Sequence, residues 1–299
     1  WLKISLARRL GAIPLSSRGA CSGQGRPSGR RVGFMDGAAP EGPAEDAAER
    51  PGDPEILAHE REVKGEAESL ALVGPQLSLD VLKAQYADNP GFLPKVENLG
   101  RRFGALRRTR PDGNCFYRAY IFGIFEQLLG QKERHAAFSA RAKAALDYCV
   151  EVGYEKVAIE EFYEEFASCL ERLAVEGASV ATLEAILEEN DGYLVCWARC
   201  LTSAYLKHHA EEYGAFLTSH SSIQQFCAQE VDPMATEADH LQIVALSSYF
   251  GVPVCVVYLD RSEGDVAAEH LFDGGGASGP FSPVHLLYRP GHYDVIYPS

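Results

Sequence analysis

The chain has 299 residues, of which 46% are hydrophobic and 10% aromatic, enough for a full core without disulfides or a structural metal. Its formal net charge of −14 argues against a nucleic-acid partner. No apolar run reaches the roughly 18 residues of a membrane span, so we expect no membrane association.

Residues 1–34 contain seven basic residues and no Asp or Glu. This composition is typical of a transit peptide, but organelle targeting is the weaker interpretation. The chain begins with Trp1, and Met35 followed by Asp36 looks like a natural start, so we expect residues 1–34 to be translated upstream sequence. Residues 35–54 are acidic and rich in Ala, Pro and Gly, and this predicts a disordered segment.

Hydrophobic periodicity predicts mostly helices in the first two thirds of the remaining chain. An amphipathic helix is expected at 55–72, and Ser78 is expected to cap a short helix through Tyr86. A loop with Pro90 and Pro94, a basic patch at Arg101–Arg110 and a turn at 111–114 follow. Further helices are predicted at 115–129, 132–152, 159–173, 179–190, 192–208 and from Ser221 to about Glu230. A capping box at Thr236–Asp239 predicts a last helix that ends at Gly251.

Three runs of β-forming residues follow that last helix, at 254–258, 284–288 and 292–297, and residues 261–283 read as a Gly-rich loop. The pattern predicts an α+β fold with many helices and a small sheet completed by the C-terminal strands.

The eight cysteines form no CxxC pair, and we interpret them as reduced thiols of a cytoplasmic or nuclear protein. Cys196 and Cys200 have the spacing of a metal-binding pair on a helix, but no His or Cys partner pair follows at finger spacing. We therefore expect core residues there and no metal or other cofactor.

A polar turn, Pro111-Asp112-Gly113-Asn114, delivers Cys115 to the start of an apolar helix. Unpaired amides and the helix dipole at this position favour a thiolate, the reactive form of cysteine. The same turn could direct backbone N–H groups at a developing oxyanion. A buried cysteine after an ordinary turn fits these residues equally well.

His292 and Asp294 lie two apart in a predicted strand, so their side chains face the same side. The carboxylate could hold one tautomer of the imidazole and leave the other nitrogen for a thiol, while Tyr293 would face the core. An HxD pattern alone is weak evidence, and it gains weight from the Cys115 turn upstream.

The segment Arg110–Ala119 resembles the nucleophile motif of the ovarian-tumour (OTU) deubiquitinases, specifically the otubains. Leu287–Tyr297 resembles the histidine motif of the same branch. The segments Leu201–Leu206, Phe226–Met234 and Glu237–His240 are also similar to otubains, and the resemblance extends over roughly residues 55–297.

The resemblance implies a papain-like OTU fold, a catalytic domain at 76–299 and an N-terminal helix at 55–75 that contacts a second ubiquitin. It implies that Cys115 attacks the isopeptide carbonyl, that His292 transfers the proton and that Asp294 orients His292. The remaining site residues that we expect are Asp112 in the catalytic set, the backbone of Asp112, Gly113, Asn114 and Cys115 as oxyanion hole, and Asp239, His240 and Tyr293 as substrate contacts.

The function implied is removal of ubiquitin from lysine side chains of polyubiquitin chains by a monomeric, thiol-dependent hydrolase. A second interpretation, from a different class, is a module that mainly binds and restrains ubiquitin-conjugating enzymes. A cysteine hydrolase with an unrelated substrate is the third.

Overall fold

The computed structural model describes residues 69–276 and 279–299, and all of them belong to one compact unit. The segments 1–34 and 35–54 and most of the helix expected at 55–72 lie outside the described residues. The last four residues of that expected helix, 69–72, form a turn and a bend. Strand β1 then includes positions 75 and 76, where we expected the catalytic domain to begin.

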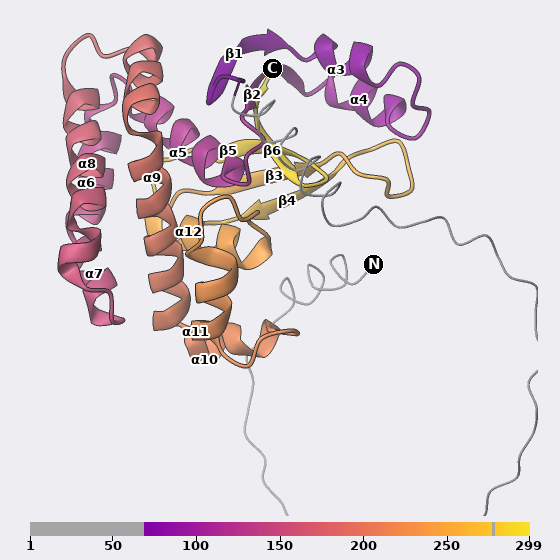
Figure 1. Cartoon of the computed structure of the whole chain (residues 1–299). Helices are drawn as coiled ribbons and strands as arrows, with labels where there is room; N and C mark the ends of the chain where they lie inside the picture. The colour runs from indigo at the N-terminus through magenta and orange to yellow at the C-terminus, as the bar shows by residue number, and fades with distance from the viewer. Residues whose placement is uncertain (1–68, 277–278) are drawn as a thin grey trace, which may run out of the picture. The chain divides into compact units, whose positions relative to one another are not determined.

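A mixed sheet organises the described residues, with six strands in the order β1-β2-β6-β5-β3-β4 (Figure 1). The strands are β1 (Val73–Ser78), β2 (Phe103–Thr109), β3 (Val254–Tyr258), β4 (Ala268–Phe272), β5 (Val284–Arg289) and β6 (His292–Pro298). Only β3 and β5 pair in parallel among these strands. The three late strands that we predicted are confirmed.

Two early strands and β4 contradict the sequence-based prediction. The expected basic patch Arg101–Arg110 contains β2, where Arg107 is buried and its guanidinium covers the Phe122 ring at 5.2 Å. Strand β4 lies inside the expected Gly-rich loop, because its backbone pairs with β3 from Val254 to Tyr258. Pairing with a neighbouring strand, more than the β propensity of its own residues, makes such an edge segment a strand.

The helices in chain order are α3 (Asp80–Gln85), α4 (Leu93–Leu99), α5 (Cys115–Leu128), α6 (Lys132–Lys143), α7 (Ala145–Glu151), α8 (Lys156–Ala174), α9 (Val180–His208), α10 (Ala210–Tyr213), α11 (Ile223–Phe226), the π-helix η2 (Cys227–Val231) and α12 (His240–Phe250), with a 3-10 turn η1 (Gly214–Phe216). Ser78 precedes α3, as predicted, and accepts a hydrogen bond from the amide of Asp80.

Several predicted helix boundaries were wrong. Helix α4 occupies the expected proline loop, because Pro94 stands in its first turn, where a missing N–H costs nothing. The helices expected at 179–190 and 192–208 are one, since packing against α5 and α8 outweighs the roughly 1 kcal/mol cost of Gly192. The predicted helix 132–152 is two. The capping box of α12 is formed by Asp239 and Gln242, one turn later than expected.

Both faces of the sheet are buried. Alternate residues of each strand point to opposite faces and so pack into two separate hydrophobic cores. Val256 and Leu286 pack with α5, α9 and α12, whereas Val257 and Leu287 pack with α3 and α4. In Figure 1, α5 lies between the sheet and the long helices α8 and α9, and it packs against β6. This arrangement places Cys115 beside the β5–β6 hairpin.

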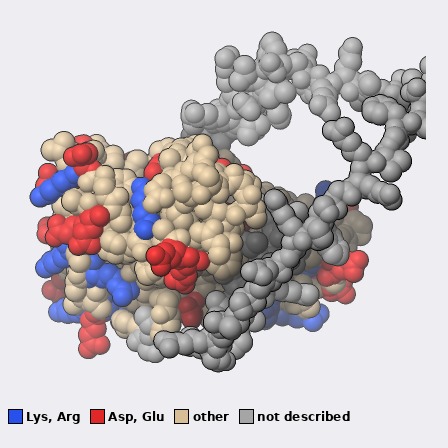
Figure 2. All heavy atoms as spheres, turned by 90° about the horizontal axis from the view of Figure 1, so that it is seen from below, with Lys and Arg blue, Asp and Glu red and all other residues tan. Residues whose placement is uncertain are grey.

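In the part of the chain that the structure describes, no helix combines the length and the apolar character that crossing a membrane requires. Figure 2 shows one face of the molecule, on which Lys and Arg side chains stand among Asp and Glu around a mostly uncharged centre. A nucleic-acid surface is typically basic over a continuous patch, and this face has no such character.

Candidate active site

Cys115 is the first residue of α5, and its side chain is 2% exposed. The turn before it reverses at Gly113, whose φ of +77° is accessible to glycine at little cost. A Cβ at Gly113 would lie 2.2 Å from the carbonyl oxygen of Ala235, so only glycine fits this close backbone approach. The turn thus positions a thiol at the positive end of a helix dipole.

His292 and Asp294 form the pair that the strand pattern predicted. The Nε2 atom of His292 donates to Oδ1 of Asp294 at 2.7 Å. The other ring nitrogen, Nδ1, is buried and has no hydrogen-bond partner of normal geometry. Cys115 nevertheless lies close enough to His292 to affect its pKa, so the structure brings thiol, imidazole and carboxylate together.

Asp294 is fully buried and has two further partners that sequence reasoning missed. It accepts from the amide of Thr109 at 3.0 Å and from Nη2 of Arg289 at 2.6 Å. Burial opposes its charge, but the contacts with His292 and Arg289 hold the pKa of Asp294 below its usual range. A permanently ionised carboxylate can fix the orientation and tautomer of its histidine.

The charge of His292 follows from these contacts. Burial opposes protonation of the ring, but the hydrogen bond with Asp294, the nearby Cys115 sulfur and the negative charge of Asp294 raise the pKa of His292 to about 9. The imidazole is therefore held in its protonated form at neutral pH, a state that stabilises a neighbouring thiolate.

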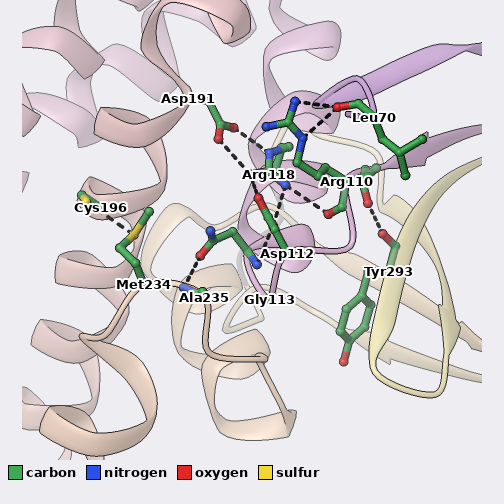
Figure 3. A network of polar contacts seen from close by, with 12 residues as sticks. Leu70, Arg110, Asp112, Gly113, Arg118, Asp191, Cys196, Met234, Ala235 and Tyr293 are labelled. Carbon is green, nitrogen blue, oxygen red and sulfur yellow. Dashed lines mark hydrogen bonds and ion pairs between the residues drawn. The ribbon is translucent and has the colours of Figure 1, made fainter. Parts of the chain in front are cut away.

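The carboxylate of Asp112 is tied to the turn and to α5. It accepts two hydrogen bonds from the guanidinium of Arg118, at 2.9 and 2.7 Å, and one from the amide of Asn114 at 2.9 Å. Although burial opposes its charge, the contact with Arg118 lowers the pKa of Asp112. Arg118 also holds Asp191 of α9, so a buried guanidinium between two partly buried carboxylates braces the turn (Figure 3).

Two of the four backbone amides expected in the oxyanion hole already have partners. The amide of Asp112 donates to the carbonyl of Arg110 at 3.0 Å, and that of Asn114 donates to the Asp112 carboxylate. Either amide would have to exchange its partner before it could bind an oxyanion. Within the described residues the amides of Gly113 and Cys115 donate no backbone hydrogen bond outside α5, so they need no such exchange to fit the expected role.

A cavity of about 630 Å³ is bordered by His292 and by Pro111 of the turn before Cys115. Its other walls come from residues 70–71, from β1 and β2, from Tyr86 just after α3, and from the hairpin that carries the histidine. Leu77, Tyr86 and Pro290 give it apolar surface, and Arg108 and Arg289 give it positive charge. The cavity therefore offers space beside His292 for the leaving group of a reaction at Cys115.

The three expected substrate contacts lie in different surroundings. Tyr293 is 4% exposed, faces the core as predicted and donates its hydroxyl to the carbonyl of Ala238. Asp239 caps α12. His240 begins α12 next to His270 of β4, and burial followed by the charge of His270 lowers the pKa of His240 to about 4.

The Cys196 and Cys200 pair does not form a recognisable metal site. The thiol of Cys196 contacts the thioether of Met234 at 3.5 Å. Over residues 69–276 and 279–299, no group of three or more His, Cys, Asp or Glu side chains is arranged to hold a metal ion.

Sequence reasoning missed the two arginines that support the Cys115 turn. Arg118 and Arg199 are each 1% exposed, and both interrupt otherwise apolar helical segments. A charged residue in such a segment is a usable signal, because a buried charge is stable only with several partners.

Comparison with known proteins identifies the family of the chain. The family model for peptidase C65, otubain, matches residues 65–298. The human ubiquitin thioesterase OTUB1 is 36% identical over 249 residues, which are 82% of this chain and 90% of the relative. An otubain-like ubiquitin thioesterase from Caenorhabditis elegans is 34% identical over 82% of this chain and 89% of the relative.

Solved structures give the same result for the fold. A complex described as h/ceOTUB1, ubiquitin aldehyde and UBC13~Ub matches with a TM-score of 0.74 at 31% identity, over 83% of this chain and 98% of the solved one. The corresponding complex with UBCH5B~Ub gives 0.74 at 32% identity over the same shares. With a family model that covers most of its length and relatives above 30% identity, the chain belongs to the otubain family of C65 peptidases.

Proposed function

We propose that this chain hydrolyses the isopeptide bond between the C-terminus of ubiquitin and a lysine side chain, with Cys115 as nucleophile, His292 as proton carrier and Asp294 as its orienting carboxylate. The observation that carries the proposal is that the Cys115 thiol, at a helix N-terminus, lies near an imidazole that is hydrogen-bonded to a buried carboxylate. Membership of the otubain family supports ubiquitin as the substrate, since its curated relatives are named ubiquitin thioesterases.

The proposed reaction has two steps with one acyl intermediate. The sulfur of Cys115 attacks the isopeptide carbonyl, and its proton resides on His292. The C–N bond then breaks, the lysine amine takes that proton, and a thioester remains on Cys115. Water attacks the thioester and gives one proton to His292, and the C–S bond breaks. Ubiquitin leaves as a carboxylic acid that loses its remaining proton to solvent, and the pair of Cys115 thiolate and His292 imidazolium is restored. The amides of Gly113 and Cys115 stabilise the oxyanion in both steps.

The position of the cavity supports an assignment of the leaving side. The leaving amine must receive its proton from His292, and the cavity of about 630 Å³ borders that residue. The acceptor lysine and its neighbours would occupy this space, while the ubiquitin tail approaches Cys115 from the other side. Asp239 and His240 remain our candidates for contacts with ubiquitin.

A ubiquitin derivative with a C-terminal electrophile tests the proposal. We expect wild-type protein to form a covalent adduct that Cys115→Ala abolishes. Cys200→Ala removes a half-buried thiol of α9 outside the site and should leave adduct formation unchanged. A panel of ubiquitin dimers then reports which linkages are cleaved.

The base needs a separate measurement. His292→Ala should abolish turnover of a ubiquitin dimer while the far-UV circular dichroism spectrum stays that of the wild type. Adduct formation by Cys115→Ala, or full turnover by His292→Ala, would refute the assignment of nucleophile or base.

A second candidate is binding of a ubiquitin-conjugating enzyme. The observation in its favour is the match to solved complexes that contain UBC13~Ub and UBCH5B~Ub. Titration of the Cys115→Ala variant with such a ubiquitin-charged enzyme tests it. If the wild type and the Cys115→Ala variant bind the charged enzyme with equal affinity, this role is supported. Absence of binding at micromolar concentration would exclude it.

A further inference from the structure

Arg199 of α9 is a buried cation without a carboxylate partner. Its side chain is 1% exposed, and within the described residues its guanidinium takes part in no ion pair. Burial lowers the pKa of Arg199, as expected for a charge removed from water. Such a residue is costly to keep, so its contacts merit a functional explanation.

Those contacts converge on the turn that carries the nucleophile. Nη2 of Arg199 donates to the carbonyl of Gly113 at 3.1 Å and to Oδ1 of Asn114 at 2.8 Å. The same atom donates to the carbonyl of Thr236 at 2.8 Å, and Nη1 donates to that of Val231 at 2.9 Å. One side chain therefore joins the Cys115 turn to the segment 231–236.

These bonds fix the plane of one peptide group. In a trans peptide the C=O and N–H point in opposite directions. With the carbonyl of Gly113 on Arg199, the following N–H of Asn114 points to the other side, where the Asp112 carboxylate accepts it at 2.9 Å. The peptide between Gly113 and Asn114 is thus held from both ends, directly before Cys115.

The segment 231–236 reinforces this arrangement. Ala235 has a φ of +61°, an unfavourable value for a residue with a Cβ, and its amide donates to Oδ1 of Asn114 at 2.9 Å. Figure 3 shows this bond and the close approach of Ala235 to Gly113. Arg199 also stacks on the Tyr117 ring at 4.3 Å, which fixes its guanidinium plane.

We propose that Arg199 is a positioning residue for the oxyanion hole. It sets the peptide planes of the turn so that the free amides beside Cys115 face the developing oxyanion, and this role rests on the proposed isopeptidase function. Arg199 does not contact substrate. Lysine cannot reproduce the role, because an ammonium lacks the planar fork that reaches four acceptors.

The test compares two reactions of Cys115 that differ in one respect. Hydrolysis of a ubiquitin C-terminal amide passes through an oxyanion, whereas alkylation by iodoacetamide does not. For Arg199→Lys we expect kcat for hydrolysis to fall about 10²-fold, the cost of a misplacement near 1 Å. KM and the alkylation rate should each stay within about threefold. Arg172→Lys, an exposed arginine of α8 paired with Glu189, is the matched control and should change neither reaction.

Asn114→Ala provides a second variant, which leaves Arg199 in place and removes Oδ1 of Asn114, the acceptor that Arg199 shares with the amide of Ala235. It should show the same selective loss, and the double variant with Arg199→Lys should lose little more than either single one.

Equal losses in hydrolysis and alkylation in both variants, or no loss in either, would overturn the positioning role. The wild-type protein alone shows whether the proposed isopeptidase function itself fails. Wild-type protein would then react with iodoacetamide at Cys115 but hydrolyse no ubiquitin substrate, and both proposals would fall.

Discussion

Replacement of Gly113 by alanine is the sharpest perturbation of the site that the structure allows. The new Cβ would lie 2.2 Å from the carbonyl oxygen, 2.4 Å from the carbonyl carbon and 2.9 Å from the Cα of Ala235, all of them backbone atoms. Ordinary contact begins at 3.4 Å, so the oxygen or the turn must move by about 1.2 Å. A displacement of about 1 Å at a catalytic group costs about 10²-fold in rate. The φ of +77° adds about 1–2 kcal/mol of strain.

We therefore expect Gly113→Ala to lower kcat/KM for a ubiquitin dimer by about 10²-fold or more, with a lower melting temperature. Gly177→Ala separates strain from displacement, because Gly177 has a φ of +86° and no atom within 4 Å of the place that a Cβ would occupy. This control should lose stability to a similar backbone strain and keep its activity. Equal activity of the two variants would show that the close approach of Ala235 does not set the position of the nucleophile.

Three other predictions concern buried charges. Because its folded pKa of about 9 exceeds the ordinary 6.5, His292 should stabilise the fold by at most about 3 kcal/mol below pH 6.5, and this gain should disappear as pH rises through 9. Urea unfolding of wild type and His292→Gln at pH 6 and pH 10 measures the difference. Asp294→Asn should slow turnover by about 10²–10⁴-fold, whereas Arg289→Gln, which leaves the His292 bond intact, should cost less in single-turnover assays. Asp191→Asn should lower the free energy of unfolding by about 3 kcal/mol, since Arg118 stays buried with one carboxylate fewer, and chemical denaturation would detect it.

The placement of the candidate site residues was predictable because it depends on local patterns. Cys115 follows a polar turn and opens an apolar helix, and both features can be recognised from five or six residues. His292 and Asp294 share a strand face for the same local reason. Their neighbour Tyr293 was correctly expected to face the core, where it is 4% exposed.

The supporting contacts could not be predicted, because they join residues far apart in the chain. Nothing near Asp294 in the sequence indicates that the amide of Thr109 binds its carboxylate, since that bond depends on how β2 pairs with β6. The basic residues of β2 suggested an exposed patch, yet Arg107 packs on an aromatic ring. Pairing and packing of distant segments override local composition at such positions.

The segment 231–239 connects the turn before Cys115 with the hairpin before His292, and it approaches a glycine of each. Ala235 lies against Gly113 in the turn before the nucleophile. On the other side, a Cβ at Gly291, in the hairpin before the base, would lie 2.8 Å from a carboxylate oxygen of Glu237. The hydroxyl of Tyr293 donates to the backbone of the same segment. The distance between thiol and imidazole therefore depends on this third segment, which contains neither group. Substitutions within it should alter the rate of reaction through the spacing of the two motifs.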